Sequence, residues 1–339
     1  LMKNRIVYLD LLKIIACYLV IVNHVGIYIM RYSIHTPWIV FFYSLSFSFC
    51  KIAVPLFVMA SGALLLSRQD TYSKMLSRIV KILVPLVGLS LLLYVYRHGF
   101  GSVLGFIPSF LQERAIVPFW YLYMLVGLYL ITPFIQKMIK NFMDLDYQVF
   151  LLLFLILPSL ALMVSKLTGF TLYKEFFTAL FPVVIGYYVA GHYLSKVTLK
   201  SSTLWWVAAG VIVMLVFSTA LMTIANLDAA EVVFPVDNIY FFNNVVMALG
   251  VFVLMKNVAV LTKLSDRIAS LISQIASLTF GIYLIHAFLF SFIAESALSK
   301  AFFALSPELA LLTLEIVVFM VSGLLIAGLK KIPLIRDYL

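Results

Sequence analysis

The sequence predicts an all-α, polytopic membrane protein with about ten transmembrane helices and both termini in the cytoplasm. Composition is the first observation: 64% of the 339 residues are apolar and only 11% are charged, whereas soluble domains carry about 25% charged residues. The mean hydropathy of +1.12 agrees with lipid as the main solvent. The second observation is a series of apolar stretches, and the third is an uneven distribution of Lys and Arg between the two sides of those stretches.

Ten apolar stretches approach or exceed the roughly 20 residues that cross a bilayer as a helix. The second is long for one crossing, so we expect it to tilt or to bend near Pro55, where the ring nitrogen cannot donate a hydrogen bond. The glycine-rich connection 97–117 is expected to form a re-entrant or interfacial segment. The stretches are 6–30, 37–66, 78–96, 118–139, 147–165, 175–195, 203–225, 238–260, 276–298 and 308–329.

The basic residues predict the orientation of these spans. With the N-terminus inside, 16 of the 24 Lys and Arg residues fall on the cytoplasmic side, six fall on the outer side, and Lys13 and Lys51 lie within spans. Cytoplasmic connections of membrane proteins are enriched in Lys and Arg. This rule explains the net charge of +10 without a nucleic-acid partner, and no connection is long enough for a nucleic-acid-binding domain. We expect one integral-membrane domain over 1–339.

The first span carries three ionisable residues, Asp10, Lys13 and His24. A helix turns by about 100° per residue, so the three side chains share one stripe, with Lys13 and His24 roughly 16 Å apart along the axis. In the structural interpretation, Asp10 pairs with Lys13 near the interface and His24 is a satisfied core histidine. In the functional interpretation, the stripe is a polar path across the membrane that ends at a general base. Asn23 and Tyr28 are nearby and are expected as hydrogen-bond partners of its ring.

Three further ionisable residues fall within later spans: Lys51, His286 and Glu315. Charged groups in lipid are costly and usually face a cavity or one another. His286 is either a buried structural donor or part of a site. Glu315 is expected beside Lys51, Lys13 or a histidine. The second span, which carries Lys51, also contains the Ser61-Gly62 pair, and such a pair is typical of helices that approach closely.

Four basic residues, Arg68, Lys74, Arg78 and Lys81, precede or begin the third span. They either anchor the helix on the cytoplasmic side or form a socket for phosphate groups, since guanidinium and ammonium groups pair with phosphate oxygens.

An aromatic segment that includes Trp120 and Tyr121 begins the fourth span. An interfacial belt accounts for it, and aromatic faces at the outer mouth also suit sugar rings. The two cysteines, Cys17 and Cys50, fall in apolar runs and are expected to be small core residues. No Cys/His cluster has zinc spacing, so no metal is predicted.

Four motifs, in order on this frame, resemble those of the acyltransferase 3 superfamily of membrane O-acyltransferases, which modify cell-envelope glycans. Leu9-Asp10 precedes Lys13, which is followed after ten residues by His24. The second motif is Pro55–Gly62, and the third runs from Phe119-Trp120-Tyr121-Leu122 through Tyr129 to Thr132-Pro133. The last is Ile282-Tyr283-Leu284-Ile285-His286. The chain departs from the family at two places. Position 13 is Lys, whereas many members have Arg there. The basic pair that the family often has as Arg-x-x-Arg is Arg78-x-x-Lys81 in this chain.

The resemblance implies cytoplasmic acyl-CoA, commonly acetyl-CoA, as donor and a hydroxyl of an envelope glycan or glycolipid as acceptor, in a bacterial inner membrane. His24 would act as general base or as acyl carrier, with Asp10 and Lys13 as catalytic partners. Lys13 and the four basic residues of the third span would hold the donor. Trp120, Tyr121, His286 and Glu315 would hold the acceptor.

The other function that the residues allow is a secondary transporter or exporter of a glycan or small solute. Its intramembrane Lys, His and Glu would form a proton relay. The oligomeric state stays open, a homo-oligomer included.

Overall fold

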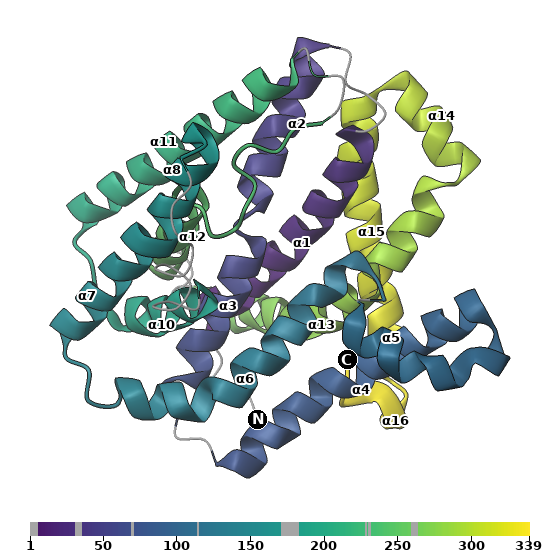
Figure 1. Ribbon diagram of the computed structural model, residues 1–339, viewed down its shortest axis with the longest axis horizontal. Coiled ribbons are helices and arrows are strands. Elements are labelled where there is room, and N and C mark those ends of the chain that lie inside the picture. The colour runs from purple at the N-terminus through teal and green to yellow at the C-terminus, as the bar shows by residue number, and fades with distance from the viewer. Residues whose placement is uncertain are drawn as a thin grey trace. The chain divides into compact units, whose positions relative to one another are not determined.

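The computed structural model describes residues 6–30, 36–68, 71–113, 115–170, 183–227, 229, 232–258 and 264–339. These residues form helices and their connections and contain no strand, which confirms the all-α prediction (Figure 1). The chain divides into two compact units. Unit 1 is Leu1–Ser67 with Phe142–Gly323, and unit 2 is Arg68–Asn141 with Leu324–Leu339. The expectation of a single integral-membrane domain remains a prediction.

Unit 1 is built around α1, which packs against α2, α3, α12 and α13. A second set of contacts joins α10 to α3, α7 and α12, and α11 to α2 and α12. The elements are α1 (Val7–Met30), α2 (Pro37–Cys50), α3 (Ala53–Leu65), α7 (Asp144–Phe154), the π-helical turn η3 (Leu155–Leu160), α8 (Ala161–Thr168), α10 (Val183–Lys196), α11 (Ser201–Asn226), α12 (Phe242–Lys256), α13 (Asp266–Ala294), α14 (Ala297–Leu305) and most of α15 (Pro307–Leu329).

Unit 2 is an antiparallel helix pair, α4 (Tyr72–His98) and α6 (Trp120–Ile139), with the end of α15 and the short α16 (Pro333–Arg336). The connection between α4 and α6 is itself helical. It consists of η1 (Phe100–Gly105), α5 (Phe106–Gln112) and the single turn η2 (Val117–Phe119). Gly99 begins this connection with φ +77°, a conformation that residues with a Cβ seldom adopt.

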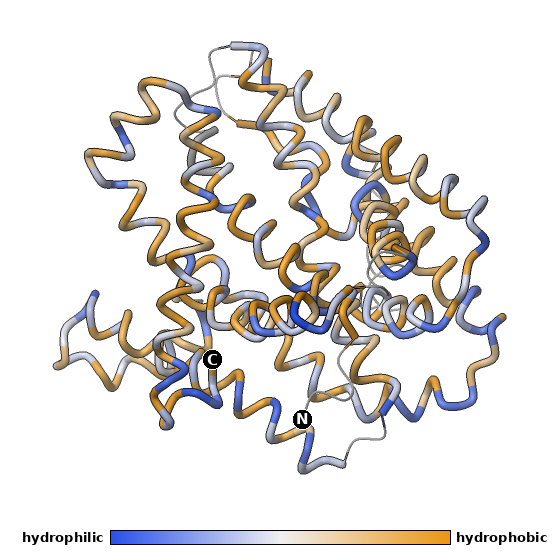
Figure 2. The backbone as a smooth tube through the Cα atoms, turned by 180° about the vertical axis from the view of Figure 1, so that it is seen from behind, coloured by the Kyte–Doolittle hydropathy of each residue, from blue (hydrophilic) through white to orange (hydrophobic). Residues whose placement is uncertain are grey.

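Eight helical segments among the described residues are long and apolar enough to cross a membrane. Each of the ten predicted spans contains a helix, but α10 has 14 residues and α12 has 15, short of the roughly 20 that a crossing requires. Part of the predicted span 175–195 also lies outside the described residues. The count of ten and the cytoplasmic termini therefore remain predictions. Hydrophobic residues dominate along the helices (Figure 2).

The long second span is interrupted, as predicted, next to Pro55. The helix stops at Cys50, residues 51 and 52 form a turn, and α3 begins at Ala53. Pro55 cannot donate to the carbonyl of Lys51, four residues earlier, and its ring would clash with that carbonyl in a continuous helix. The interruption therefore places Lys51 at a helix break inside unit 1.

Two glycines bring the backbones of α3 and α10 into contact. A Cβ on Gly62 would collide with the carbonyl oxygen of Tyr188, and a Cβ on Gly191 would collide with the carbonyl oxygen of Met59. Small residues at facing positions let membrane helices pack at their closest distance. This contact confirms the close approach predicted from Ser61-Gly62.

We expect Gly62→Ala and Gly191→Ala each to destabilise the protein by about 1–3 kcal/mol, the usual cost of inserting a methyl group into packed space. The measurement is the thermal unfolding midpoint of the purified protein in detergent. Gly210→Ala is the matched control, because a Cβ at Gly210 in α11 meets no atom within 4 Å. Equal midpoints for all three variants would contradict the packing.

Candidate active site

The first ionisable residues of α1 form an ion pair, as the structural interpretation predicts. The Lys13 ammonium lies 3.3 Å from Asp10 Oδ1. The Ser273 hydroxyl of α13 donates to Asp10 Oδ2 at 2.7 Å. Asp10 is buried, whereas 28% of the Lys13 side chain is exposed. The carboxylate thus has partners on both oxygens, and it joins the beginning of α1 to α13.

Two more polar contacts follow between α1 and α13, farther along both helices. The Cys17 thiol lies 3.5 Å from the carbonyl oxygen of Thr279, and the rings of His24 and His286 lie 5.3 Å apart. Residue numbers rise together on both helices, so α1 and α13 run in the same direction. That agrees with the predicted topology, in which both cross from the cytoplasmic to the outer side.

His24 and His286 form the centre of a group of polar side chains in unit 1. His286 is buried, and its Nδ1 donates to the carbonyl oxygen of Tyr283 at 2.6 Å. That bond assigns the proton to Nδ1 and leaves Nε2 as an acceptor. The Nε2 atom is buried and meets no hydrogen-bond partner among the described residues. His286 is therefore fixed in orientation, with one polar atom available to a ligand.

Lys51 lies at the break between α2 and α3, near His24. Its ammonium is buried, donates to Asn23 Oδ1 at 2.8 Å and lies 3.5 Å from the centre of the Phe47 ring. It is within electrostatic range of His24 and of Asp237, on the connection before α12. A buried ammonium needs such partners because desolvation of a charge is costly. The side chain thus places a cation near His24.

Glu315 of α15 accepts a hydrogen bond from the Tyr18 hydroxyl at 3.1 Å, through Oε2. Its other oxygen, Oε1, is buried and has no partner in the described part of the chain. The neighbours expected for Glu315 were Lys51, Lys13 or a histidine. The hydrogen-bonded neighbour is instead Tyr18, which lies six residues, or about 1.7 turns, before His24 on α1.

We call His24, Asn23, Lys51 and His286 the histidine cluster. The structure brings together two of the sequence-predicted site residues, His24 and His286, and adds Lys51, whereas Glu315 bonds Tyr18. Asp10 and Lys13 lie elsewhere: they are 14 and 11 residues from His24, which is about 21 and 16 Å along α1. They are too far away to touch an atom that reacts at His24.

The sequence did not predict three partners of the ionisable residues: Tyr18 for Glu315, Asp237 for Lys51 and Ser273 for Asp10. Nothing in their spacing relates them to Glu315, Lys51 or Asp10, because those partners are brought near only by packing. Asn23 was expected to bond the His24 ring, but its oxygen accepts from Lys51. The side chain of Tyr28, the other expected partner, lies outside the described residues.

The basic residues proposed for the donor lie in unit 2. Lys74, Arg78 and Lys81 are spaced by four and three residues on α4, so their side chains share one face of the helix. Lys74 and Lys81 are exposed, as is Arg68, and Arg78 is half-buried. This face, with Arg68 just before α4, is chemically suited to anionic groups.

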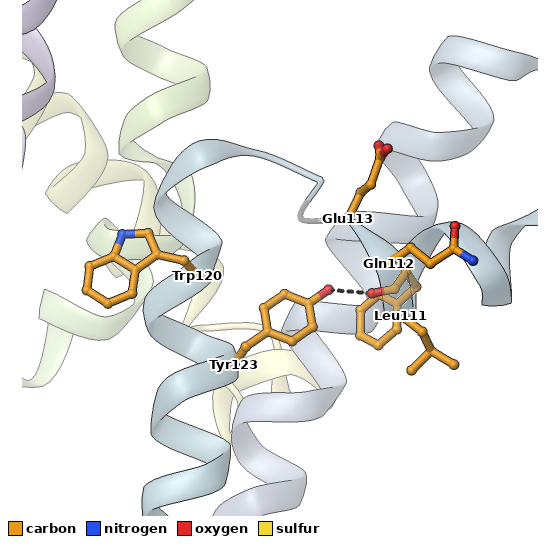
Figure 3. A pocket seen from close by; sticks show the side chains of 6 residues that line it. Leu111, Gln112, Glu113, Trp120 and Tyr123 are labelled. Carbon is orange, nitrogen blue, oxygen red and sulfur yellow. Dashed lines mark hydrogen bonds between the residues drawn. The ribbon is translucent and has the colours of Figure 1, made fainter. Parts of the chain in front are cut away.

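The opposite end of unit 2 contains an open groove between α5 and the start of α6. Its volume is about 560 Å³, and it is lined by Phe110, Leu111, Gln112, Glu113, Trp120 and Tyr123. Figure 3 shows the Tyr123 hydroxyl directed at the end of α5, whereas the Trp120 indole projects from the other side of α6. Tyr121 is only 6% exposed and belongs to the core of the unit.

One comparison with known proteins shows the family of the chain. The sequence model of an acyltransferase domain family, acyltransferase 3, matches residues 6–330, so the match covers nearly the whole chain. Neither a curated protein nor a solved structure matches the chain. Together with the apolar helices, the family match identifies a membrane acyltransferase: the chain belongs to the acyltransferase 3 family.

Proposed function

We propose that the protein transfers an acyl group, in the first instance acetyl, from cytoplasmic acyl-CoA to a hydroxyl group of a bacterial envelope glycan. The observation that carries this proposal is the histidine cluster. It places a titratable side chain next to a buried cation and next to a second histidine, whose buried Nε2 has no partner among the described residues. Such groups are costly in lipid and mark functional sites.

In the direct route, a nitrogen of His24 takes the proton of the acceptor hydroxyl as its oxygen attacks the thioester carbonyl carbon. The new C–O bond forms, the C–S bond breaks, and the departing CoA thiolate takes the proton from the imidazolium. The products are an O-acyl ester and CoA. In the other route, His24 first carries the acyl group and then passes it to the hydroxyl.

Lys51 supports either route by its charge. Attack on the thioester carbonyl places negative charge on oxygen, and a preorganised cation in a water-poor site stabilises such an oxyanion. The Asn23 amide oxygen and the Phe47 ring hold the ammonium in place before any substrate arrives. We propose that the Lys51 ammonium is this cation.

His286 and Glu315 support binding of the acceptor. Nε2 of His286 and Oε1 of Glu315 are acceptor atoms that lack partners among the described residues. Leaving such atoms buried and unpaired costs about 1–3 kcal/mol each. Hydroxyl groups of a sugar would donate to both atoms and remove that cost, which favours a polyhydroxylated acceptor.

The donor's phosphates are proposed to bind Arg68 and the basic face of α4. Phosphates cannot enter lipid unpaired, and Lys74, Arg78 and Lys81 present charge from one helix face. Lys at position 81, in place of the Arg of many family members, keeps the charge but loses the bidentate fork.

Replacing both Arg78 and Lys81 by Gln is expected to raise the KM for acetyl-CoA about tenfold or more and to leave kcat at saturating donor nearly unchanged. Each charged hydrogen bond that is lost costs about 1.5–3 kcal/mol of binding. Initial rates over a range of acetyl-CoA concentrations measure both constants. Lys140→Gln, on the exposed end of α6, is the matched control. An unchanged KM in the double variant would place the phosphates elsewhere.

The test of the proposed function is release of CoA thiol from acetyl-CoA by the purified protein in lipid nanodiscs, followed together with ester formation on added envelope glycan. Equal amounts of thiol and ester are expected. Neither product, together with movement of a solute into sealed vesicles, would favour the transporter instead.

A further inference from the structure

The groove of unit 2 has the dimensions of a binding site for a small molecule. Its volume of about 560 Å³ falls within the range of about 300–1,000 Å³ that is usual for such sites. It lies at the C-terminal end of α4, and the basic face lies near the N-terminal end. Arg78 and Arg97 are 19 residues apart on this helix, about 28 Å along its axis. The groove is therefore remote from the residues proposed for the donor phosphates.

The floor of the groove is preorganised by aromatic contacts. The Tyr123 hydroxyl donates to the carbonyl oxygen of Phe110 at 3.0 Å, and the two rings are 5.4 Å apart. Phe110 contacts Phe106 at 5.5 Å between ring centres, and Phe106 contacts Tyr94 of α4 at 5.7 Å. This chain of rings joins α4, α5 and α6, so the groove keeps its shape without a ligand.

The lining of the groove combines aromatic rings with hydrogen-bonding groups. Gln112 contributes an amide that both donates and accepts, and Glu113 contributes two acceptor oxygens. Both side chains are exposed at the end of α5 and lie next to the rings of Phe110 and Tyr123. A sugar ring has C–H faces that pack on aromatic surfaces and hydroxyl groups that pair with amides and carboxylates. The lining therefore suits a saccharide.

The segment beside the groove also presents an apolar stripe. Phe100, Leu104, Ile107 and Leu111 are 84%, 94%, 67% and 75% exposed. Phe100 and Leu104 lie on η1, and Ile107 and Leu111 lie four residues apart on one face of α5. Four large apolar side chains exposed in a row suit a lipid surface and not water. Leu111 belongs to both the stripe and the groove lining, so the groove opens directly beside the stripe.

From this juxtaposition we infer that the groove binds a membrane-anchored saccharide, with its sugar in the groove and its lipid chain along the apolar stripe. The inference rests on the proposed function, since it names the form in which the acceptor is presented: a glycolipid, and not a free polysaccharide. The lipid anchor confines the acceptor to the membrane plane and so raises its effective concentration at the groove.

The test is crosslinking from inside the groove, using the full chain with a photoreactive phenylalanine analogue in place of Leu111. The protein is placed in nanodiscs of bacterial total lipid extract supplemented with polyprenyl-phosphate-linked saccharides. After illumination, mass spectrometry of the crosslinked peptide identifies the occupant. We expect adducts that contain both the lipid and sugar units. The same analogue in place of Trp205, which is 78% exposed on α11, is expected to yield phospholipid adducts alone.

Combining Gln112→Ala and Glu113→Ala with the crosslinker is expected to lower the glycolipid adduct about tenfold, a loss of roughly 1.4 kcal/mol in binding. Glu295→Ala, on the surface pair with Lys300, is expected to leave it unchanged. Adducts at position 111 with phospholipid alone, or with a free saccharide added at the same concentration, would overturn the inference. The experiment contains no acyl donor, so its outcome is independent of whether the protein transfers acyl groups.

Discussion

His24→Ala is expected to lower the rate of CoA release in the presence of glycan about 100- to 10,000-fold, the usual contribution of a positioned general acid–base. The alanine removes the only ring in the histidine cluster that α1 contributes, so neither the direct route nor the acyl-histidine route remains. Initial rates at saturating acetyl-CoA measure the loss.

Two controls keep this prediction specific. The Kd for acetyl-CoA should be unchanged, because the phosphates are proposed to bind residues other than His24. The thermal unfolding midpoint should also stay within a few degrees of that of the native protein. A His24→Ala protein that transfers acyl groups at the normal rate would eliminate His24 as base and as acyl carrier.

Lys51→Met is expected to lower kcat about 100- to 1,000-fold, the cost of removing one oxyanion-stabilising group. Methionine keeps much of the side-chain volume but removes the charge beside His24. It also removes the donor 2.8 Å from Asn23 Oδ1. The KM for acetyl-CoA is expected to change little, because Lys51 is not among the residues proposed to hold its phosphates. Steady-state rates at varied donor concentration separate kcat from KM.

A structural role for Lys51 would have a different signature. Lys51→Arg restores a cation and should recover part of kcat if the charge matters. Lys300→Met is the matched control: Lys300 forms an exposed ion pair with Glu295, and such pairs contribute about 0–1 kcal/mol. If Lys51→Met lowered the unfolding midpoint strongly while kcat of the folded fraction stayed normal, the oxyanion role would be wrong.

Local chemistry explains what could be predicted from the sequence. The apolar stretches identified a helix in every predicted span, since lipid demands long apolar helices with internally bonded backbones. Pro55 predicted the interruption of the second span because the missing N–H acts within one turn. The pairing of Asp10 with Lys13 followed from their spacing on a single helix. Cys17 and Cys50 are buried and free, as their apolar surroundings indicated.

The rest depends on contacts between distant parts of the chain. The Tyr18–Glu315 hydrogen bond joins residues 297 positions apart, and the Lys51–Asn23 bond exists only because the helix break turns Lys51 toward α1. Trp120 and Tyr121 were treated alike from the sequence. Tyr121 is buried, whereas Trp120 borders the groove, because adjacent residues on a helix point about 100° apart. The short lengths of α10 and α12 also escaped the hydropathy pattern.

The most direct test of the central claim is acyl transfer across a sealed membrane. Proteoliposomes receive acetyl-CoA, labelled in the acetyl group, only outside, and envelope glycan with its lipid-linked precursors only inside. We expect labelled ester on the enclosed saccharide with the native protein, and almost none with His24→Ala, at equal protein content. Equal labelling by both proteins, or labelling only when donor and acceptor share one side, would contradict the claim.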